Sequence, residues 1–258
     1  TIAPAVHLVE TRNFLIFSAW DATHDKALGN VCEEMNAKLR QQFNLQPNET
    51  AWAGKCPVYV FWRTADFRRF GTEVDQSPAI QSKIARNDGY HATRGRFSYI
   101  AISGIQDFGS PLTSATTRFY EVLVHEGTHG FMSRFMGNRP LPLWIEEGLA
   151  DYMAATLVPT SVATRKYLEG TRHAAQAPNA AGSIFDKKEF VSLDYGISQS
   201  LVRYLMASDG RAFVRLVERL KQGVPEEKAL AECYRVSRSE LVRRWTKHCQ
   251  QYLARHPS

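Results

Sequence analysis

The sequence lacks any long hydrophobic run. Its 258 residues contain no apolar stretch near the roughly 18–20 residues that a membrane-spanning helix needs, so we expect no membrane span. Glycine and proline are scarce, at 16 and 11 residues, which excludes collagen-like and low-complexity chains. The 44% apolar and 22% charged residues instead match a globular protein and exclude a disordered one. The chain is long enough to bury a large core.

Cysteine is also scarce, and its four positions lack metal-site spacing such as C-x-x-C. Cys32 falls in an expected helix and Cys56 just before an expected strand. These two residues could therefore form a disulfide or remain buried free thiols. Cys233 and Cys249 flank the start of a helix and should lie too far apart to bond locally.

A strong charge bias is absent. Lysine and arginine number 32 against 26 aspartate and glutamate residues, and the densest basic spots are only Arg68-Arg69, Arg94 with Arg96, and Arg243-Arg244. Because no zinc finger or aromatic RNA-binding signature accompanies them, we expect solvated surface charges and no nucleic-acid partner. A basic nucleic-acid-binding domain stays open as a rival interpretation, which metal analysis would test.

The N-terminal third is predicted to alternate between strand and helix. Its aromatic and β-branched residues predict three strands, at residues 13–18, 57–62 and 96–103. Leu28, Met35 and Leu39 recur at helical spacing, so residues 25–43 should form an amphipathic helix. The polar stretch before the third strand carries only a turn signal, Asn87-Asp88-Gly89.

After Ser110-Pro111 the pattern becomes helical. Helices are predicted at residues 113–136, 143–157, 194–208 with Asp194 as N-cap, 211–222, from Pro225 onward, and after a capping box at 237–240. Residues 159–192 are rich in Ala, Pro, Gly and Asn and are predicted to be irregular, either as a lid or cleft wall or as a long surface loop. The fold class is therefore predicted to be α+β. An N-terminal strand–helix lobe with a small mixed sheet, about 1–136, should precede a mainly helical lobe, about 137–258.

The residues with the clearest chemistry are His125-Glu126-Gly127-Thr128-His129. Two histidines at i and i+4 lie about 40° apart around a helix, one turn along, so both imidazoles can bind one ion. Zinc suits imidazole nitrogen, and Glu126 can reach a metal-bound water without being a ligand. We therefore expect one Zn²⁺ with His125 and His129 as ligands.

A catalytic zinc needs a third protein ligand. The metzincin extension is ruled out, because Met132 and Phe135 occupy the positions that need Gly and His. The next carboxylates are Glu146 and Glu147, which follow a loop at 137–142 that can reverse the chain.

Glu147 is distinguished from Glu146 by its neighbour at i+4. That neighbour is Asp151 for Glu147 and Ala150 for Glu146. A ligating histidine needs an acceptor for its other ring N–H, and Asp151 could serve His125 in this way. We therefore predict Glu147 as the third ligand, Glu146 as a neighbour, and Asp151 as the acceptor behind the metal ligands.

The HEGTH motif followed by P-L-W-I-E-E-G-L-A-D-Y resembles the gluzincins, the zinc peptidases that include thermolysin and the zinc aminopeptidases. The match is nearest to the broad peptidase-MA-like group, and W-x-x-E-G-x-A is similar to the aminopeptidase segment that carries the third ligand. The resemblance covers roughly residues 95–250, with specific motifs only in 125–151 and 195–205. It implies one zincin-like catalytic domain with its active site in the cleft between the two lobes.

With the even cysteine count and a first residue other than Met, the resemblance also leads us to expect a periplasmic or secreted protein whose leader has been removed.

Residues 195–205 look like the aminopeptidase helix that begins with the transition-state tyrosine. On that match Tyr195 is the counterpart, although Ser198 replaces the usual Gly and Gly196 stands where a charged residue is common. The Gly-x-Met-Glu-Asn-like exopeptidase signature is absent, and the strand at 97–103 holds no acidic residue for a substrate amino terminus. The resemblance therefore implies an endopeptidase rather than an aminopeptidase.

The function predicted from these residues is a zinc-dependent metallopeptidase that acts on peptide or protein substrates. A zinc-activated water would attack the peptide bond, Glu126 would act as the general base, and Tyr195 would stabilise the oxyanion. The strand at 97–103 is expected to be an edge strand that pairs with an extended peptide, near His91. The alternative is a zinc-binding recognition module that keeps the peptidase scaffold without hydrolysis.

Overall fold

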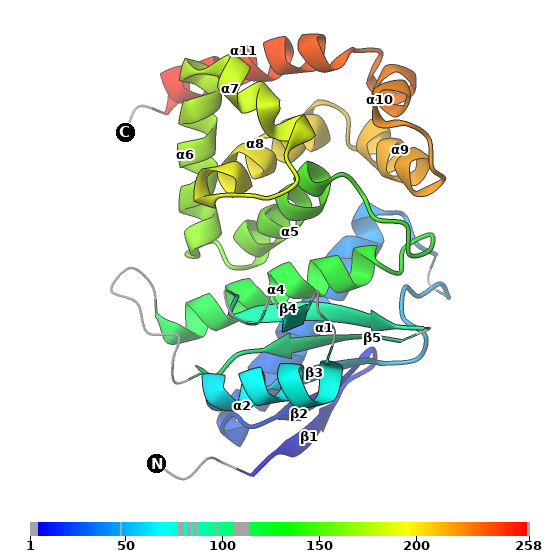
Figure 1. Ribbon diagram of the computed structural model, residues 1–258, viewed down its shortest axis with the longest axis vertical. Coiled ribbons are helices and arrows are strands. Elements are labelled where there is room, and N and C mark those ends of the chain that lie inside the picture. Colours follow the sequence, from blue (N-terminus) through cyan, green and yellow to red (C-terminus); the bar gives the residue numbers. More distant parts are fainter. Residues whose placement is uncertain are drawn as a thin grey trace. The chain divides into compact units, whose positions relative to one another are not determined.

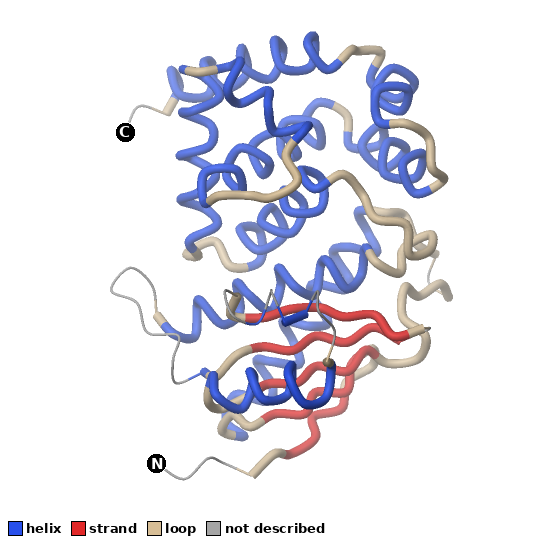
Figure 2. Tube along the Cα trace, in the orientation of Figure 1, coloured by secondary structure: helices blue, strands red, loops and turns tan. Residues whose placement is uncertain are grey.

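The protein is described by a computed structural model that covers residues 5–46, 48–76, 80–81, 84, 87–95, 97–105 and 114–256. A five-stranded mixed sheet with helices comes first and a mainly helical part follows, which confirms the predicted α+β class (Figures 1 and 2). The chain divides into two compact units, Thr1–Phe135 with Thr156–Val162, and Met136–Ala155 with Ala163–Ser258. Among the described helices, none has both the length and the apolar character for crossing a membrane.

The sheet of the first unit has the strand order β1-β2-β3-β5-β4. Its strands are β1 (His7–Glu10), β2 (Phe14–Ser18), β3 (Cys56–Val60), β4 (Gly89–Arg94) and β5 (Phe97–Ile102). The three central strands are parallel, whereas β1 and β4 run antiparallel to their neighbours. Strand β4 is therefore an edge strand and β5 is internal. The prediction that residues 97–103 form the edge was wrong.

Strand β4 lies where the sequence predicts only a turn, because its residues GYHATR carry no β-branched run. Pairing with β5 and packing of alternate side chains make it a strand. Tyr90 and Ala92 are buried in a cluster with Tyr99 and Ala101 of β5. The intervening His91 therefore points to the opposite face of the sheet.

Helices cover both faces of this sheet (Figure 1). On one face α1 (Asp25–Gln42) packs against α4 (Ala115–Met132), and α4 also contacts β4 and β5. On the other face Phe67 of α2 (Thr64–Arg69) joins the aromatic cluster of Tyr90 and Tyr99. A short 3₁₀ turn, η1 (Ala22–His24), precedes α1, and a π-helical turn, η2 (Phe70–Asp75), follows α2.

The carboxylate of Asp75, with only 1% of its side chain exposed, fastens the π-helical turn to the β4–β5 hairpin. It accepts hydrogen bonds from the hydroxyls of Tyr90 and Tyr99. Arg94 Nη2 lies 3.2 Å from Asp75 Oδ1 and also donates to the carbonyls of Val74 and Asp75. A buried charge thus has both hydrogen-bond partners and a counter-ion, as burial requires.

Replacing Asp75 with Asn should lower the free energy of unfolding by about 1–3 kcal/mol, because a buried network loses its charged acceptor. Urea denaturation measures the change. Arg94→Gln is the matched control and should have a smaller effect, since the Arg94 side chain is 56% exposed. An Asp75→Asn protein as stable as the parent would show that the carboxylate does not hold the turn in place.

The second unit is built from helices alone (Figure 2). They are α5 (Leu143–Leu157), α6 (Val162–Gln176), α7 (Pro178–Gly182), the 3₁₀ turn η4 (Ser183–Asp186), α8 (Ser192–Ser208), α9 (Gly210–Lys221), α10 (Glu226–Tyr234) and α11 (Arg238–Arg255). Its buried residues include Leu201, Phe213 and Trp245. Trp245 Nε1 donates to Ser200 Oγ at 3.1 Å, so the indole N–H is satisfied inside the core.

Several predicted helix boundaries differ from those observed. Residues 159–192 are mostly helical in α6, α7 and η4, because their alanines favour helix, so the prediction of an irregular segment was wrong. Helix α8 begins at Ser192 with Val191 as N-cap, and Asp194 is the third helical residue, whose carboxylate accepts the Val191 N–H at 2.9 Å. Helix α4 ends at Met132 rather than 136. Ser110-Pro111 and Thr113 lie outside the described residues.

Other predictions agree with the structure. Helix α5 has the predicted bounds of 143–157. Ser237 Oγ accepts the Glu240 N–H at 3.2 Å and so caps α11 as the sequence predicts.

All four cysteines are free thiols, so Cys32 and Cys56 form no disulfide. Cys32, Cys56 and Cys249 are buried, and burial raises the pKa of each of these thiols.

Candidate metal centre

Helix α4 carries the two histidines of the HEGTH motif. Ser114 Oγ caps its first turn by accepting the Thr117 N–H at 3.1 Å, and Phe119, Leu123 and Phe131 bury its apolar face. The helix therefore presents His125 and His129 one turn apart. Their Nε2 atoms lie 3.0 Å from each other and are partly buried.

Glu126 lies between the two histidines in sequence and is buried, with 8% of its surface exposed. Its Oε2 accepts the backbone N–H of His91 at 3.1 Å. Burial would raise the pKa of this carboxyl, but a hydrogen bond from the His91 side chain and the electrostatic effect of the nearby imidazoles outweigh it and lower the pKa to about 2. Glu126 is therefore ionised at neutral pH.

His91 of β4 belongs to the same cluster. Its ring stacks on that of His129, with centroids 5.3 Å apart, and its Nδ1 lies 3.7 Å from Glu126 Oε2. The sequence offered a weak signal for this position, a histidine near an expected strand. It could not show that His91 lies on an edge strand with its backbone N–H bound to Glu126, because the strand itself was missed.

The loop that leads into α5 is fixed by hydrogen bonds within the second unit. Lys221 Nζ of α9 donates to the carbonyls of Gly137 and Arg139, at 3.3 and 2.8 Å. Glu146 Oε1 accepts the Leu141 N–H at 2.9 Å. The Glu146 carboxylate therefore forms a hydrogen bond at the start of α5, and Glu147 is the next residue along this helix.

Ligand atoms of His125, His129 and Glu147 all lie within 4.8 Å of one another. Each residue offers one such atom, so the three form a group that could hold a metal ion. The group includes the carboxylate that the sequence favours, Glu147, and the spacing is zincin-like. No catalytic function follows from this grouping alone.

Lys166 of α6 lies close to both Asp151 and Tyr195, the other two site residues predicted from sequence. Lys166 Nζ is 3.8 Å from Asp151 Oδ2 and 4.9 Å from the centroid of the Tyr195 ring. Asp151 is only 2% exposed, so it is no ordinary surface charge. Tyr195 also packs edge-on against Phe190, with ring centroids 5.5 Å apart. Lys166 was not singled out from sequence, because nothing in its local pattern marks it.

Close backbone contacts at two glycines set the positions of these residues. A Cβ atom on Gly196 of α8 would lie 2.0 Å from the carbonyl oxygen of Lys166, and one on Gly148 of α5 would lie 2.6 Å from that of Ser198. Helix α8 therefore packs directly against the backbones of α5 and α6. Only glycine fits at these two contacts.

Comparison with known proteins adds no relative: no protein-family model matches the chain, and no curated protein is significantly similar to it. A functional assignment therefore depends on the chemistry of the candidate centre.

Proposed function

We propose that this protein is a zinc-dependent metallopeptidase in which His125, His129 and Glu147 hold one zinc ion. The observation that carries the proposal is the convergence of two imidazoles and one carboxylate within 4.8 Å. Two histidines and one glutamate are a donor set of catalytic rather than structural zinc sites, since three protein ligands leave one coordination position open.

The distance between the histidines supports the fit of zinc. Zinc–imidazole bonds of about 2.0–2.1 Å at tetrahedral angles place two ligand nitrogens about 3.3 Å apart. The Nε2 atoms of His125 and His129 are 3.0 Å apart, close to this value. A zinc ion held there would polarise a carbonyl group and lower the pKa of its bound water to about 7.

Glu126 is the proposed general base. Its Oε2 is held by the His91 N–H at 3.1 Å, which leaves Oε1 as the atom to take a proton from the attacking water and return it to the leaving amine. Glu126 is ionised at neutral pH, and only the ionised carboxylate can accept that proton. Glu126 has no part in metal ligation, so a binding module would not require it.

Asp151 and Tyr195 have supporting roles in this proposal. Asp151 would accept the second ring N–H of His125 and fix the orientation of that imidazole. Lys166 Nζ lies 3.8 Å from this carboxylate, at Asp151 Oδ2. The Tyr195 hydroxyl would donate a hydrogen bond to the developing oxyanion, and its ring is held by Phe190 and Lys166.

An extended peptide or protein segment is the proposed substrate. Edge strand β4, rather than β5, would pair with it, because no other described strand pairs with the outer edge of β4. His91 connects this edge to the base through its N–H bond to Glu126. Cleavage within the chain is the proposed mode of action, in an exported protein.

Metal removal tests the proposal. The purified protein should contain one zinc per chain by elemental analysis and should cleave members of a broad quenched-fluorescent peptide library. Dipicolinate, a zinc chelator, should slow cleavage by at least about 100-fold, and added zinc should restore it. Isophthalate, which has the same shape without the chelating nitrogen, is the control and should have no effect.

Two other results would contradict the proposal in different ways. Tightly bound zinc without cleavage of any library member would favour a recognition module over an enzyme. Protein that contains no zinc and takes up none would rule out the metal centre itself.

A further inference from the structure

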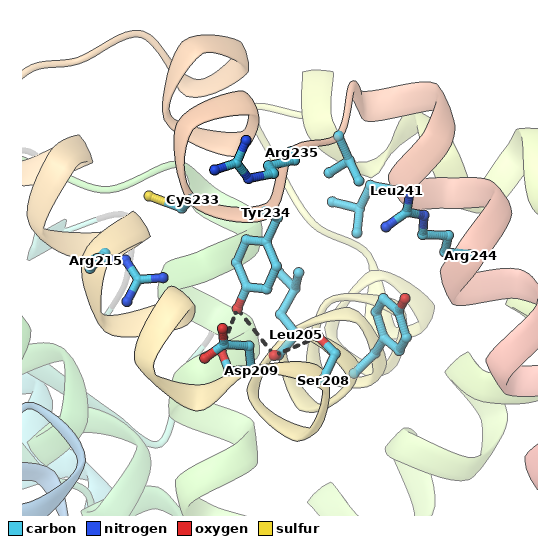
Figure 3. Close-up of a pocket in the computed structure, with 11 residues that line it drawn as sticks. Leu205, Ser208, Asp209, Arg215, Cys233, Tyr234, Arg235, Leu241 and Arg244 are labelled. Carbon is cyan, nitrogen blue, oxygen red and sulfur yellow. Dashed lines mark hydrogen bonds between the residues drawn. The ribbon is translucent and has the colours of Figure 1, made fainter.

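A second candidate binding site lies entirely within the helices of the second unit. A pocket of about 400 Å³ opens where the ends of α8 and α10 meet α9 and α11 (Figure 3). This volume falls in the range of small-molecule sites. Most of its lining is polar, and the apolar part includes Val236 and Leu241 beside the rings of Tyr204 and Tyr234.

The wall of this pocket is held rigidly by Tyr234. Its hydroxyl donates to the carbonyls of Leu205 and Asp209, at 3.1 and 3.0 Å, and so connects the end of α10 to the α8–α9 junction. Asp209 is itself fixed, because its Oδ1 caps α9 by accepting the Ala212 N–H at 2.9 Å. The pocket is thus a preformed feature of the unit.

Positive charge dominates the polar part of the lining. Arg215, Arg235 and Arg244 surround Tyr234 in Figure 3, against the single carboxylate of Asp209. Arg244 is paired with Glu240 at 2.6 Å. Arg215 and Arg235 form no ion pair with any described residue, so two guanidinium groups at this pocket have no protein carboxylate paired with them and are available to an anionic ligand.

Arg235 is also held in an unfavourable backbone conformation. It ends α10 with φ 55° and ψ 41°, the left-handed region that glycine adopts far more easily. The preceding helix, α9, has a glycine in the left-handed region one residue past its C-cap Gln222, at Gly223 with φ 88°. Replacing Arg235 with glycine would therefore relieve backbone strain.

We propose that this pocket binds a small amphiphilic anion. An aromatic or aliphatic body would contact the apolar part of the lining, Val236 and Leu241 with the Tyr204 and Tyr234 rings, and a carboxylate or phosphate group would accept hydrogen bonds from Arg215 and Arg235. Bidentate pairing with guanidinium is the strongest form of such recognition. The site shares no residue with the candidate metal centre and does not depend on the proposed hydrolysis.

Isothermal titration with defined probes tests the proposal. Phenyl phosphate and hydrocinnamate should bind at least about tenfold more tightly than the neutral hydrocinnamamide, because only the anions can pair with the arginines. Inorganic phosphate should bind more weakly than phenyl phosphate, because it lacks the apolar body. Equal affinity for anion and amide, or for phosphate and phenyl phosphate, would overturn the proposed ligand class.

Substitutions test whether Arg235 and Arg215 bind the anions. Arg235→Gly should weaken binding of both anions at least about tenfold, yet raise the Tm by roughly 2–4 °C through relief of strain. Arg215→Gln should weaken anion binding similarly, whereas Arg211→Gln, on the same helix but outside the pocket, should leave it unchanged. Anion binding that survives both Arg235→Gly and Arg215→Gln would show that the pocket is not the site.

Discussion

Glu126→Gln is expected to slow peptide hydrolysis by about 10²–10⁴-fold, the usual contribution of a positioned general base. The reason is chemical rather than structural. A glutamine amide cannot take a proton from water, but its oxygen can still accept the His91 N–H that Glu126 Oε2 now accepts at 3.1 Å. The fold and the zinc content should therefore stay as in the parent, measured by circular dichroism and elemental analysis beside the hydrolysis rate.

Glu34→Gln provides the matched control for this change, because Glu34 is an exposed residue of α1. It should cleave at the parent's rate. If Glu126→Gln kept its zinc and also cleaved at that rate, another group would have to move the proton, and the role proposed for Glu126 would be wrong.

Glu147→Gln is expected to weaken zinc binding by more than the roughly 10–100-fold that follows loss of an outer-shell partner, since a direct ligand is removed. Hydrolysis should fall in parallel at limiting zinc. Competition against a chromophoric chelator at fixed pH measures the affinity. The expected result follows from the position of Glu147 in the group with His125 and His129.

The adjacent residue makes the test specific. Glu146→Gln keeps an oxygen for the Leu141 N–H, which Glu146 Oε1 accepts at 2.9 Å, so the start of α5 should be preserved. Zinc affinity should be unchanged in this variant. Should Glu146→Gln lose zinc while Glu147→Gln retains it, the third ligand would be the other glutamate.

The residues that converge on the candidate centre were predictable because helix geometry is local. A spacing of i and i+4 places two histidines on one face of any helix, whatever the rest of the fold does. The bounds of the next helix are also set locally, and α5 has the predicted bounds of 143–157. Local rules of this kind also identified β2, β3, α1 and the Ser237 cap.

The parts that escaped prediction depend on contacts between distant segments. Strand β4 has little strand propensity of its own, and pairing with β5 makes it a strand, so neither its edge position nor the contact of His91 with Glu126 was visible in the sequence. The contact of Lys166 with Asp151 and Tyr195 requires α6, which lies where an irregular segment is predicted. The alanines of α6 favour helix, and the Pro and Gly residues in and around this segment do not prevent it.

The free cysteines give this protein intrinsic reporters of local opening. Cys32 and Cys56 are enclosed in the first unit and Cys249 in the second, whereas Cys233 is only partly covered. A thiol-specific alkylating reagent reacts with an enclosed thiol only after the surrounding structure opens. Peptide mapping of alkylated sites over time would thus report how readily each unit exposes its interior, without any substitution in the protein.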